Sequence, residues 1–245
     1  MPALVAAFFF IAVFYASVGF GGGSTYTALL ALSGIDYRIL PLLALACNIV
    51  VVTGGTVRFA RAGLVPWKGA LSLTVLAAPA AFVGGLLPIA ERQFLILLGL
   101  SLMVAGALLF LPTAKEDTGP TRLSRLIPVA AVPLGFLAGM VGIGGGIFLA
   151  PLLHLTRWNA ARQIAATASL FILVNSIAGL LGQLLKGGET RLVTAVETGL
   201  PLLIAVAIGG QIGSLLAVRY LPLRWIRIGT GALTLYVGAR LMHSL

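Results

Sequence analysis

Six long runs of apolar residues constrain this chain more than any other feature of its sequence. The runs cover residues 39–57, 67–90, 93–111, 163–185, 192–218 and 225–242. A helix needs about 20 apolar residues to cross the roughly 30 Å hydrocarbon core of a bilayer, and each run has about that length. Charged or turn-forming residues flank the runs, as at Arg58, Glu91 and Pro222. The sequence therefore predicts an all-α polytopic membrane protein.

The balance of charged and apolar residues argues against soluble folds. Of the 245 residues, 60% are hydrophobic and 9% are charged, whereas about 25% are charged in an ordinary soluble domain. The net charge of +10 comes from basic residues between the apolar runs, which membrane topology and lipid headgroups explain better than nucleic acid does. One cysteine, Cys47, and two distant histidines predict no metal cluster and no nucleophile–base pair. We therefore expect no metal, no cofactor and no catalytic residue.

Two further apolar segments, 1–33 and 127–155, are interrupted by glycine. The first interruption reads Gly-Phe-Gly-Gly-Gly-Ser at 19–24, and the second reads Gly-Ile-Gly-Gly-Gly at 142–146. Each glycine costs a helix roughly 1 kcal/mol relative to alanine, so each segment is expected to form two half-helices around a non-helical turn. Bare backbone at membrane depth is tolerated only where protein or water covers it. The broken segments either cross the membrane or re-enter from the side on which they start.

The glycines recur in an order that indicates an internal duplication. The two glycine interruptions match at an offset of 123 residues, and Gly84-Gly85 matches Gly209-Gly210 at an offset of 125. We therefore expect one transmembrane domain, 1–245, with homologous halves 1–111 and 127–245 joined by a polar linker, 112–126. Each half would contain a glycine-broken helix plus three transmembrane helices. Duplicated halves with discontinuous helices are a recurring transporter design, in which the binding site lies where the halves meet.

The number of crossings decides which loops face the cytoplasm. If both broken segments re-enter, each half has three crossings and the halves are inverted relative to each other. The basic loops 58–68, 112–126 and 219–227 then share one side, which the positive-inside rule assigns to the cytoplasm. If all eight segments cross, the basic residues are balanced between the two sides and the rule favours no orientation. We favour the re-entrant, inverted arrangement.

A motif in the second half carries a family resemblance. Residues 139–151 read Gly-Met-Val-Gly-Ile-Gly-Gly-Gly-Ile-Phe-Leu-Ala-Pro, followed by Ala-Ala-Thr-Ala-Ser at 165–169 and Asn-Ser at 175–176. With a looser copy in the first half, these residues make the chain resemble the TauE/SafE family of sulfite exporters over essentially its whole length. The first copy departs from the pattern at Ala28, which stands where the second has Pro151. The resemblance implies a multi-pass transporter of sulfur-containing organic or inorganic anions in a bacterial inner membrane.

The glycine interruptions are the strongest candidates for an anion-binding site. Successive glycine N–H groups can form an anion-binding concavity, and the N-terminus of the half-helix that follows adds partial positive charge. Close helix packing is the alternative role for these glycines, and polar groups inside apolar runs either join helices or line a pathway. No Gly-Lys-Ser/Thr follows, which argues against a nucleotide P-loop. The predicted substrate-binding residues are Gly21, Gly22, Gly23, Ser24, Thr25, Asn48, Gly144, Gly145, Gly146, Thr167, Ser169 and Asn175.

These features predict a secondary transporter that moves a small anion by alternating access. An anion channel is the alternative function, and a membrane-embedded enzyme is disfavoured. Glu197 is the one carboxylate inside an apolar run and is the candidate for proton coupling, with pairing to Arg191 at headgroup level as its favoured role. The expected partners are the anion and the lipid bilayer, with no nucleic acid. The coupling ion, the direction of transport and the oligomeric state do not follow from the sequence.

Overall fold

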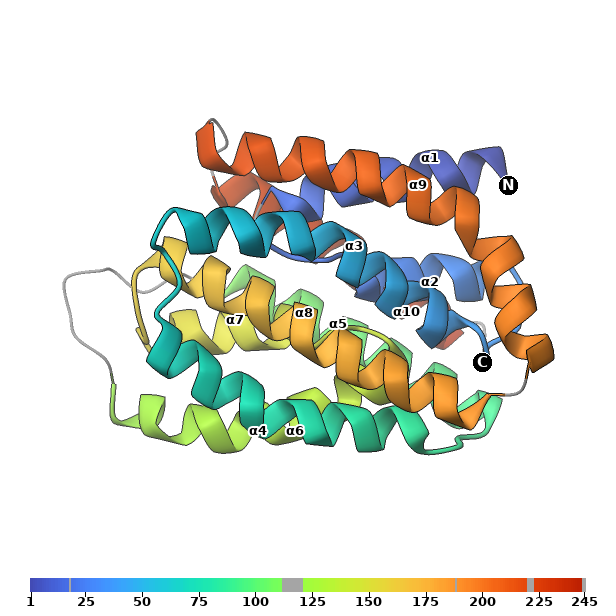
Figure 1. The fold of residues 1–245 in the computed structure, drawn as a ribbon, viewed down its shortest axis with the longest axis horizontal. Coiled ribbons are helices and arrows are strands. Elements are labelled where there is room, and N and C mark those ends of the chain that lie inside the picture. The colour runs from blue at the N-terminus through green and yellow to red at the C-terminus, as the bar shows by residue number, and fades with distance from the viewer. Residues whose placement is uncertain (18, 112–120, 188, 220–222, 244–245) are drawn as a thin grey trace.

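The computed structural model describes residues 1–17, 19–111, 121–187, 189–219 and 223–243, and all regular structure in these ranges is helical (Figure 1). The helices are α1 (Pro2–Ala16), α2 (Gly23–Leu32), α3 (Leu40–Arg61), α4 (Trp67–Leu86), α5 (Glu91–Phe110), η1 (Arg122–Leu126), α6 (Ile127–Val141), α7 (Gly146–Leu155), α8 (Ala161–Lys186), α9 (Glu189–Arg219) and α10 (Leu223–His243). The predicted helical fold class is confirmed for this part of the chain. Of the predicted linker, residues 112–120 lie outside it, and 122–126 form the 3-10 helix η1 that leads into α6.

Six helical segments among the described residues are long and apolar enough to cross a membrane. They are Leu40–Arg61, Trp67–Leu86, Glu91–Phe110, Arg122–Val141, Ala161–Lys186 and Val193–Leu216. Five of them coincide with predicted apolar runs. The sixth, Arg122–Val141, contains the first part of the second broken segment, while the predicted run 225–242 forms α10 and is not among the six. Large apolar side chains such as Phe10, Val75 and Ile204 are more than half exposed, as expected of a multi-pass protein whose surface is solvated by lipid.

Left-handed glycines separate α1 from α2 and α6 from α7. The φ angles are 84° and 85° at Gly19 and Gly22, and 85°, 78° and 76° at Gly142, Gly144 and Gly145. A residue with a Cβ is strained in this region of backbone conformation, whereas glycine adopts it freely. As a result α1 and α6 end before the glycines, and α2 and α7 begin at the last glycine of each segment.

The helix bundle has two ends, which we name by the chain segments found there. The terminal end is where α1 begins and α10 ends, and the linker end is the opposite one, where α3 ends and α4 begins (Figure 1). In Figure 1, α1 runs inward from the terminal end and α2 runs back toward it, while α6 and α7 do the same from the linker end. A hydrogen bond of 3.1 Å from the N–H of Thr121 to the carbonyl of Thr156 joins the two outer ends of the α6–α7 segment.

Small residues let neighbouring helices pack with their backbones in contact. Helix α4 packs on α6, and α9 packs on α1. A Cβ at Gly139 of α6 would overlap the carbonyl oxygen of Ala81, and one at Gly213 of α9 would overlap that of Val13. Such close van der Waals packing holds membrane helices together where lipid removes the hydrophobic drive between them. These pairs flank α3 and α8, which pack against each other and carry the polar groups described next.

Candidate anion-binding site

The first glycine segment is held by Asn48 of α3. The Oδ1 atom of this residue accepts a hydrogen bond of 2.8 Å from the backbone N–H of Gly23, in the first turn of α2. Asn48 is fully buried, and a Cβ at either Gly21 or Gly23 would overlap its side chain. Residues without side chains are therefore needed here, because they let the N-terminus of α2 approach the amide of Asn48.

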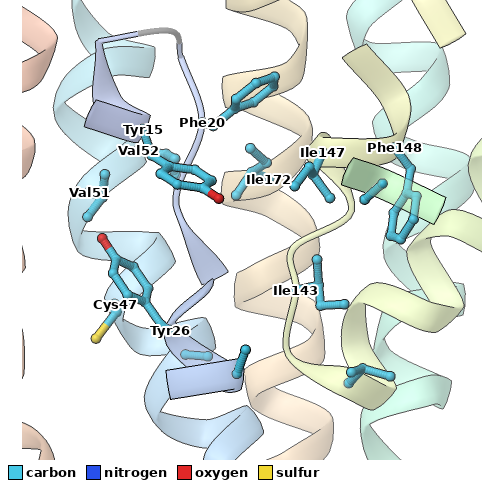
Figure 2. Close-up of a cluster of buried hydrophobic side chains, with 14 of the residues drawn as sticks. Tyr15, Phe20, Tyr26, Cys47, Val51, Val52, Ile143, Ile147, Phe148 and Ile172 are labelled. Carbon is cyan, nitrogen blue, oxygen red and sulfur yellow. The ribbon is translucent and has the colours of Figure 1, made fainter. Parts of the chain in front are cut away.

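The second glycine segment approaches the same asparagine. A Cβ added at Gly144 would lie 2.7 Å from Nδ2 of Asn48, 2.9 Å from Cγ2 of Ile172 and 3.1 Å from Oγ of Ser176. Asn48 therefore lies between the two segments, with its amide oxygen on the first and its amide nitrogen toward the second. Figure 2 shows Ile172 of α8 between the two segments, with Ile143 and Ile147 on the side of the second one.

A contact between two hydroxyls sets the register of the antiparallel helices α3 and α8. The Oγ1 atom of Thr56 and the Oγ atom of Ser169 are 3.0 Å apart. Asn48 precedes Thr56 by eight residues and Ser176 follows Ser169 by seven, so at about 1.5 Å per residue both lie some 10–12 Å from this contact. Asn48, Asn175 and Ser176 consequently share one level, close to the middle of both helices.

Buried polar atoms gather around this level without hydrogen-bond partners. Among the described residues, no partner is found for Nδ2 of Asn48, Nδ2 and Oδ1 of Asn175, Oγ of Ser176 or the hydroxyl of Tyr26. An unsatisfied buried polar group costs about 1–3 kcal/mol, and native proteins leave few of them. Ile143 and Ile172 supply apolar surroundings in which a hydrogen bond is stronger than in water. The arrangement fits a small polar ligand that accepts hydrogen bonds from Asn48 and Ser176, which meet beside Gly144, with the amide of Asn175 at the same level.

The other predicted residues of the first half contact neighbouring helices. The Oγ1 atom of Thr25 lies 2.6 Å from the hydroxyl of Tyr15 in α1, which is also 3.1 Å from Oγ1 of Thr234 in α10. Ser24 is buried beside Thr25, and a Cβ at Gly22 would meet the Tyr26 ring at 2.9 Å. These side chains join α1, α2 and α10 behind the first segment, and their part in binding stays a prediction.

The remaining predicted polar residues lie away from Asn48. Thr167 donates a 2.8 Å hydrogen bond to the carbonyl of Gln163 in its own helix, and Ser169 is occupied by Thr56. Glu197 is exposed on α9, close to the start of the apolar span that begins at Val193. Its proton-coupling role also stays a prediction, and its exposure is compatible with the favoured position at headgroup level.

The two glycine segments are chemically unequal. Gly23 faces the amide of Asn48, whereas Gly146, at the same place in the second segment, faces the apolar Ile172. A Cβ at Gly145 would lie 2.9 Å from the Phe171 ring and 3.2 Å from Ala138, and so would point into helix packing. Of the second segment, Gly144 is therefore the residue whose added side chain would meet the central polar groups.

Two residues of the site were not among the predicted binding residues. Ser176 directly follows Asn175 in sequence, and the polar pair was a usable signal. Tyr26 lies three residues after the last glycine of the first segment, stacked on Phe8 at a ring-centroid distance of 4.5 Å. From the sequence, an aromatic residue in an apolar helix is interpreted as part of the hydrophobic core. Only the structure shows that the hydroxyl of Tyr26 has no partner among the described residues and lies beside Gly22.

Comparison with known proteins relates the whole chain to a recognised family. Residues 4–241 match the family model described as sulfite exporter TauE/SafE. A probable membrane transporter protein of Sinorhizobium fredii is 36% identical over 245 residues, which cover 98% of this chain and 97% of the relative. A probable membrane transporter protein of Methanocaldococcus jannaschii is 25% identical over 219 residues, covering 85% of this chain and 81% of the relative. No solved structure matches.

Proposed function

The chain belongs to the sulfite exporter TauE/SafE family, and from this premise we propose that it is a secondary transporter of a small anion. The relatives are named as membrane transporters, and the described chain has six helices able to span a membrane. A sulfur-containing anion, such as sulfite or an organosulfonate, is the substrate class that the family name supports. The membrane would be the bacterial inner membrane.

The observation that carries the proposal is the unpartnered amide nitrogen of Asn48, Nδ2, between the two glycine segments. Its Nδ2, the amide of Asn175 and the hydroxyl of Ser176 are neutral donors without a protein partner among the described residues. The next basic residue on α3 is Arg58, ten residues after Asn48, and the next one on α8 is Lys186, ten residues after Ser176. Each therefore lies about 15 Å along its helix from these donors. The anion would therefore be held by neutral donors, each contributing about 1.5–3 kcal/mol. Without a full counter-charge, the site can also release its ligand.

Alternating access would arise from the proposed inverted repeat of halves 1–111 and 127–245. Packing of α1 on α9 has its counterpart in packing of α6 on α4, and contact of α2 with α10 has its counterpart in contact of α7 with α5. The broken segments of the two halves start from opposite ends of the bundle (Figure 1). In such proteins one repeat rocks against the other around a fixed central site. Asn48, in contact with both segments, would be part of that site.

We expect the linker end of the bundle to face the cytoplasm, because most lysine and arginine residues lie in the helix ends and connections found there. Single cysteines at Ala62 (linker end) and Ser33 (terminal end), both exposed, test this in a Cys47→Ala background, since Cys47 is buried. A membrane-impermeant thiol reagent added to intact cells should label Ser33→Cys and leave Ala62→Cys unmodified until the cells are opened. The opposite labelling pattern would reverse the orientation.

Flux through proteoliposomes tests the proposed function itself. For a carrier, uptake of labelled sulfite or of a short organosulfonate should saturate, because each molecule must occupy the central site. Unlabelled anion on the far side should speed uptake of the labelled anion, because the carrier then returns to the near side with an anion bound instead of empty. An anion channel is the second candidate function. It would be identified by uptake that rises linearly with anion concentration and does not change when unlabelled anion is present on the far side. Absence of uptake for every anion tried, by protein shown to be folded, would reject both.

A further inference from the structure

A cavity of about 260 Å³ opens at the terminal end of the bundle. Its walls come from the segment before α3, the α4–α5 connection, the end of α6 and the end of α8. The lining residues used below are Arg38, Pro41, Met140, Gln183 and Lys186, and Tyr37, Phe94 and the Pro88–Ile89 pair complete the wall. We call this cavity the vestibule. None of the residues discussed so far as donors to the anion lines it.

The floor of the vestibule contains Pro41 and Met140, and Met140 lies at the end of α6 next to the second glycine segment. Met140 lies two residues before Gly142, and a Cβ at Gly142 would lie 2.7 Å from Cα of Pro41. The buried Gln183 holds this floor, since its Nε2 donates to the carbonyls of Gly139 (3.1 Å) and Met140 (3.4 Å). Asn48 follows Pro41 by seven residues on α3, which places it about 10 Å further into the bundle. The vestibule thus lies on the terminal-end side of the central donors.

The vestibule wall is cationic. It contains Arg38 and Lys186 and no acidic residue among those that the structure describes. The Nζ atom of Lys186 donates a 3.0 Å hydrogen bond to the carbonyl of Leu87, which fixes the ammonium group at the rim. The Arg38 guanidinium is charged at any physiological pH, and a hydrogen bond with the Tyr37 side chain, followed by the charges of Asp36 and Glu91, raises its pKa further. The acids Asp36 and Glu91 line a separate neighbouring cavity of about 410 Å³, which shares Arg38. Of the two cations, Lys186 lines the vestibule and does not line that neighbouring cavity.

We propose that the vestibule is an outer anion-binding site, in which Lys186 and Arg38 capture the small anion before it reaches Asn48. This inference rests on the proposed function, and it adds a second site with a different chemistry. A cleft lined by one sign of charge with low-dielectric walls focuses the field and raises the local concentration of ions of the opposite sign. Charges at the mouth set the rate of capture, and neutral donors at the centre allow release. Pro41 and Met140 give the cavity low-dielectric walls, which strengthen the field of the two cations.

The test compares Lys186→Gln with Arg92→Gln. Arg92 is exposed at the same end of the bundle, at the start of α5, but does not line the vestibule. Uptake of a labelled organosulfonate is measured in right-side-out and inverted membrane vesicles, at low and high ionic strength. For Lys186→Gln, the KM at the terminal end should rise roughly tenfold at low salt and lose most of its salt dependence. At the linker end, KM should equal the wild-type value. Arg92→Gln should match wild type at both ends.

Two outcomes overturn the outer site while leaving the proposed function intact. In one, wild-type protein transports the anion and Lys186→Gln leaves KM unchanged at both ends. In the other, Lys186→Gln raises KM equally at both ends, which would indicate damage to the central site. If the wild-type protein shows no saturable uptake, the proposed function fails and the outer site fails with it.

A lipid headgroup has the same anionic chemistry as a free anion, so the source is tested separately. Wild type and Lys186→Gln are compared in proteoliposomes of phosphatidylcholine alone and of phosphatidylcholine with phosphatidylglycerol. A free-anion site predicts the same KM ratio between variant and wild type in both membranes. If the difference between the two proteins disappears in pure phosphatidylcholine, the vestibule holds a lipid headgroup and the proposal is wrong.

Discussion

Gly144→Ala is expected to reduce anion transport on the order of 100-fold or more while the protein still inserts and folds. The added methyl group would lie 2.7 Å from the amide nitrogen of Asn48 and 3.1 Å from the hydroxyl of Ser176, where the proposed donors would face the anion. Left-handed backbone at Gly144 (φ 78°) adds strain of about 1–2 kcal/mol for any residue with a Cβ. That strain alone is a modest fraction of the stability of a folded protein. Uptake in proteoliposomes, normalised to folded protein, measures the loss.

Gly63→Ala is the matched control for backbone strain. Gly63 also has a positive φ, 67°, but a Cβ there would meet nothing within 4 Å. This variant should carry similar strain and transport at a rate close to wild type. If Gly144→Ala transports the anion as well as Gly63→Ala does, the second glycine segment does not line the site. Gly145→Val would be a poorer test, because its side chain would strike Phe171 and Ala138.

Asn48→Asp should abolish high-affinity anion binding, with a loss of roughly 1000-fold in Kd. The substitution keeps an oxygen to accept the N–H of Gly23, and a carboxylate beside the first turn of α2 is favourable for the helix dipole. It removes the amide donor and brings a negative charge next to the anion. Two unit charges about 4 Å apart repel by about 4 kcal/mol at an effective dielectric constant of 20, and each 1.4 kcal/mol is tenfold in Kd. Titration at about pH 8, where a carboxyl group is ordinarily ionised, measures the effect.

Asn159→Asp controls for the added charge, because Asn159 is exposed at the linker end, just before α8. It should bind and transport the anion as wild type does. Asn48→Ala and Asn175→Ala should each weaken binding about tenfold, as expected for the loss of one charge-assisted hydrogen bond. If both alanine variants show the wild-type apparent affinity, and Asn48→Asp binds the anion as wild type does, then the two asparagines only join helices.

The sequence predicted the class of this protein well because that class depends on properties local to each segment. Runs of about 20 apolar residues form helices in a bilayer whatever their neighbours do. The glycine clusters at 19–23 and 142–146 likewise interrupt helices for a local reason, since only glycine adopts the left-handed backbone found there without strain. The structure adds one detail at a boundary: residues 122–126, counted in the polar linker, form a 3-10 helix, and Arg122–Val141 together is long and apolar enough to span a membrane.

Which polar residues meet was decided by the tertiary structure alone. Asn48 and Asn175 look equivalent in sequence, yet the Asn48 amide lies against Gly23 and Gly144, while Ile172 occupies the corresponding place opposite Gly146. The vestibule is assembled from segments more than 140 residues apart, as Arg38 and Lys186 show. Hydropathy and backbone preference act within a few residues, so the sequence determines helices and breaks. Contacts across α3 and α8 depend on the helix register that close packing sets, and on which face each side chain then presents.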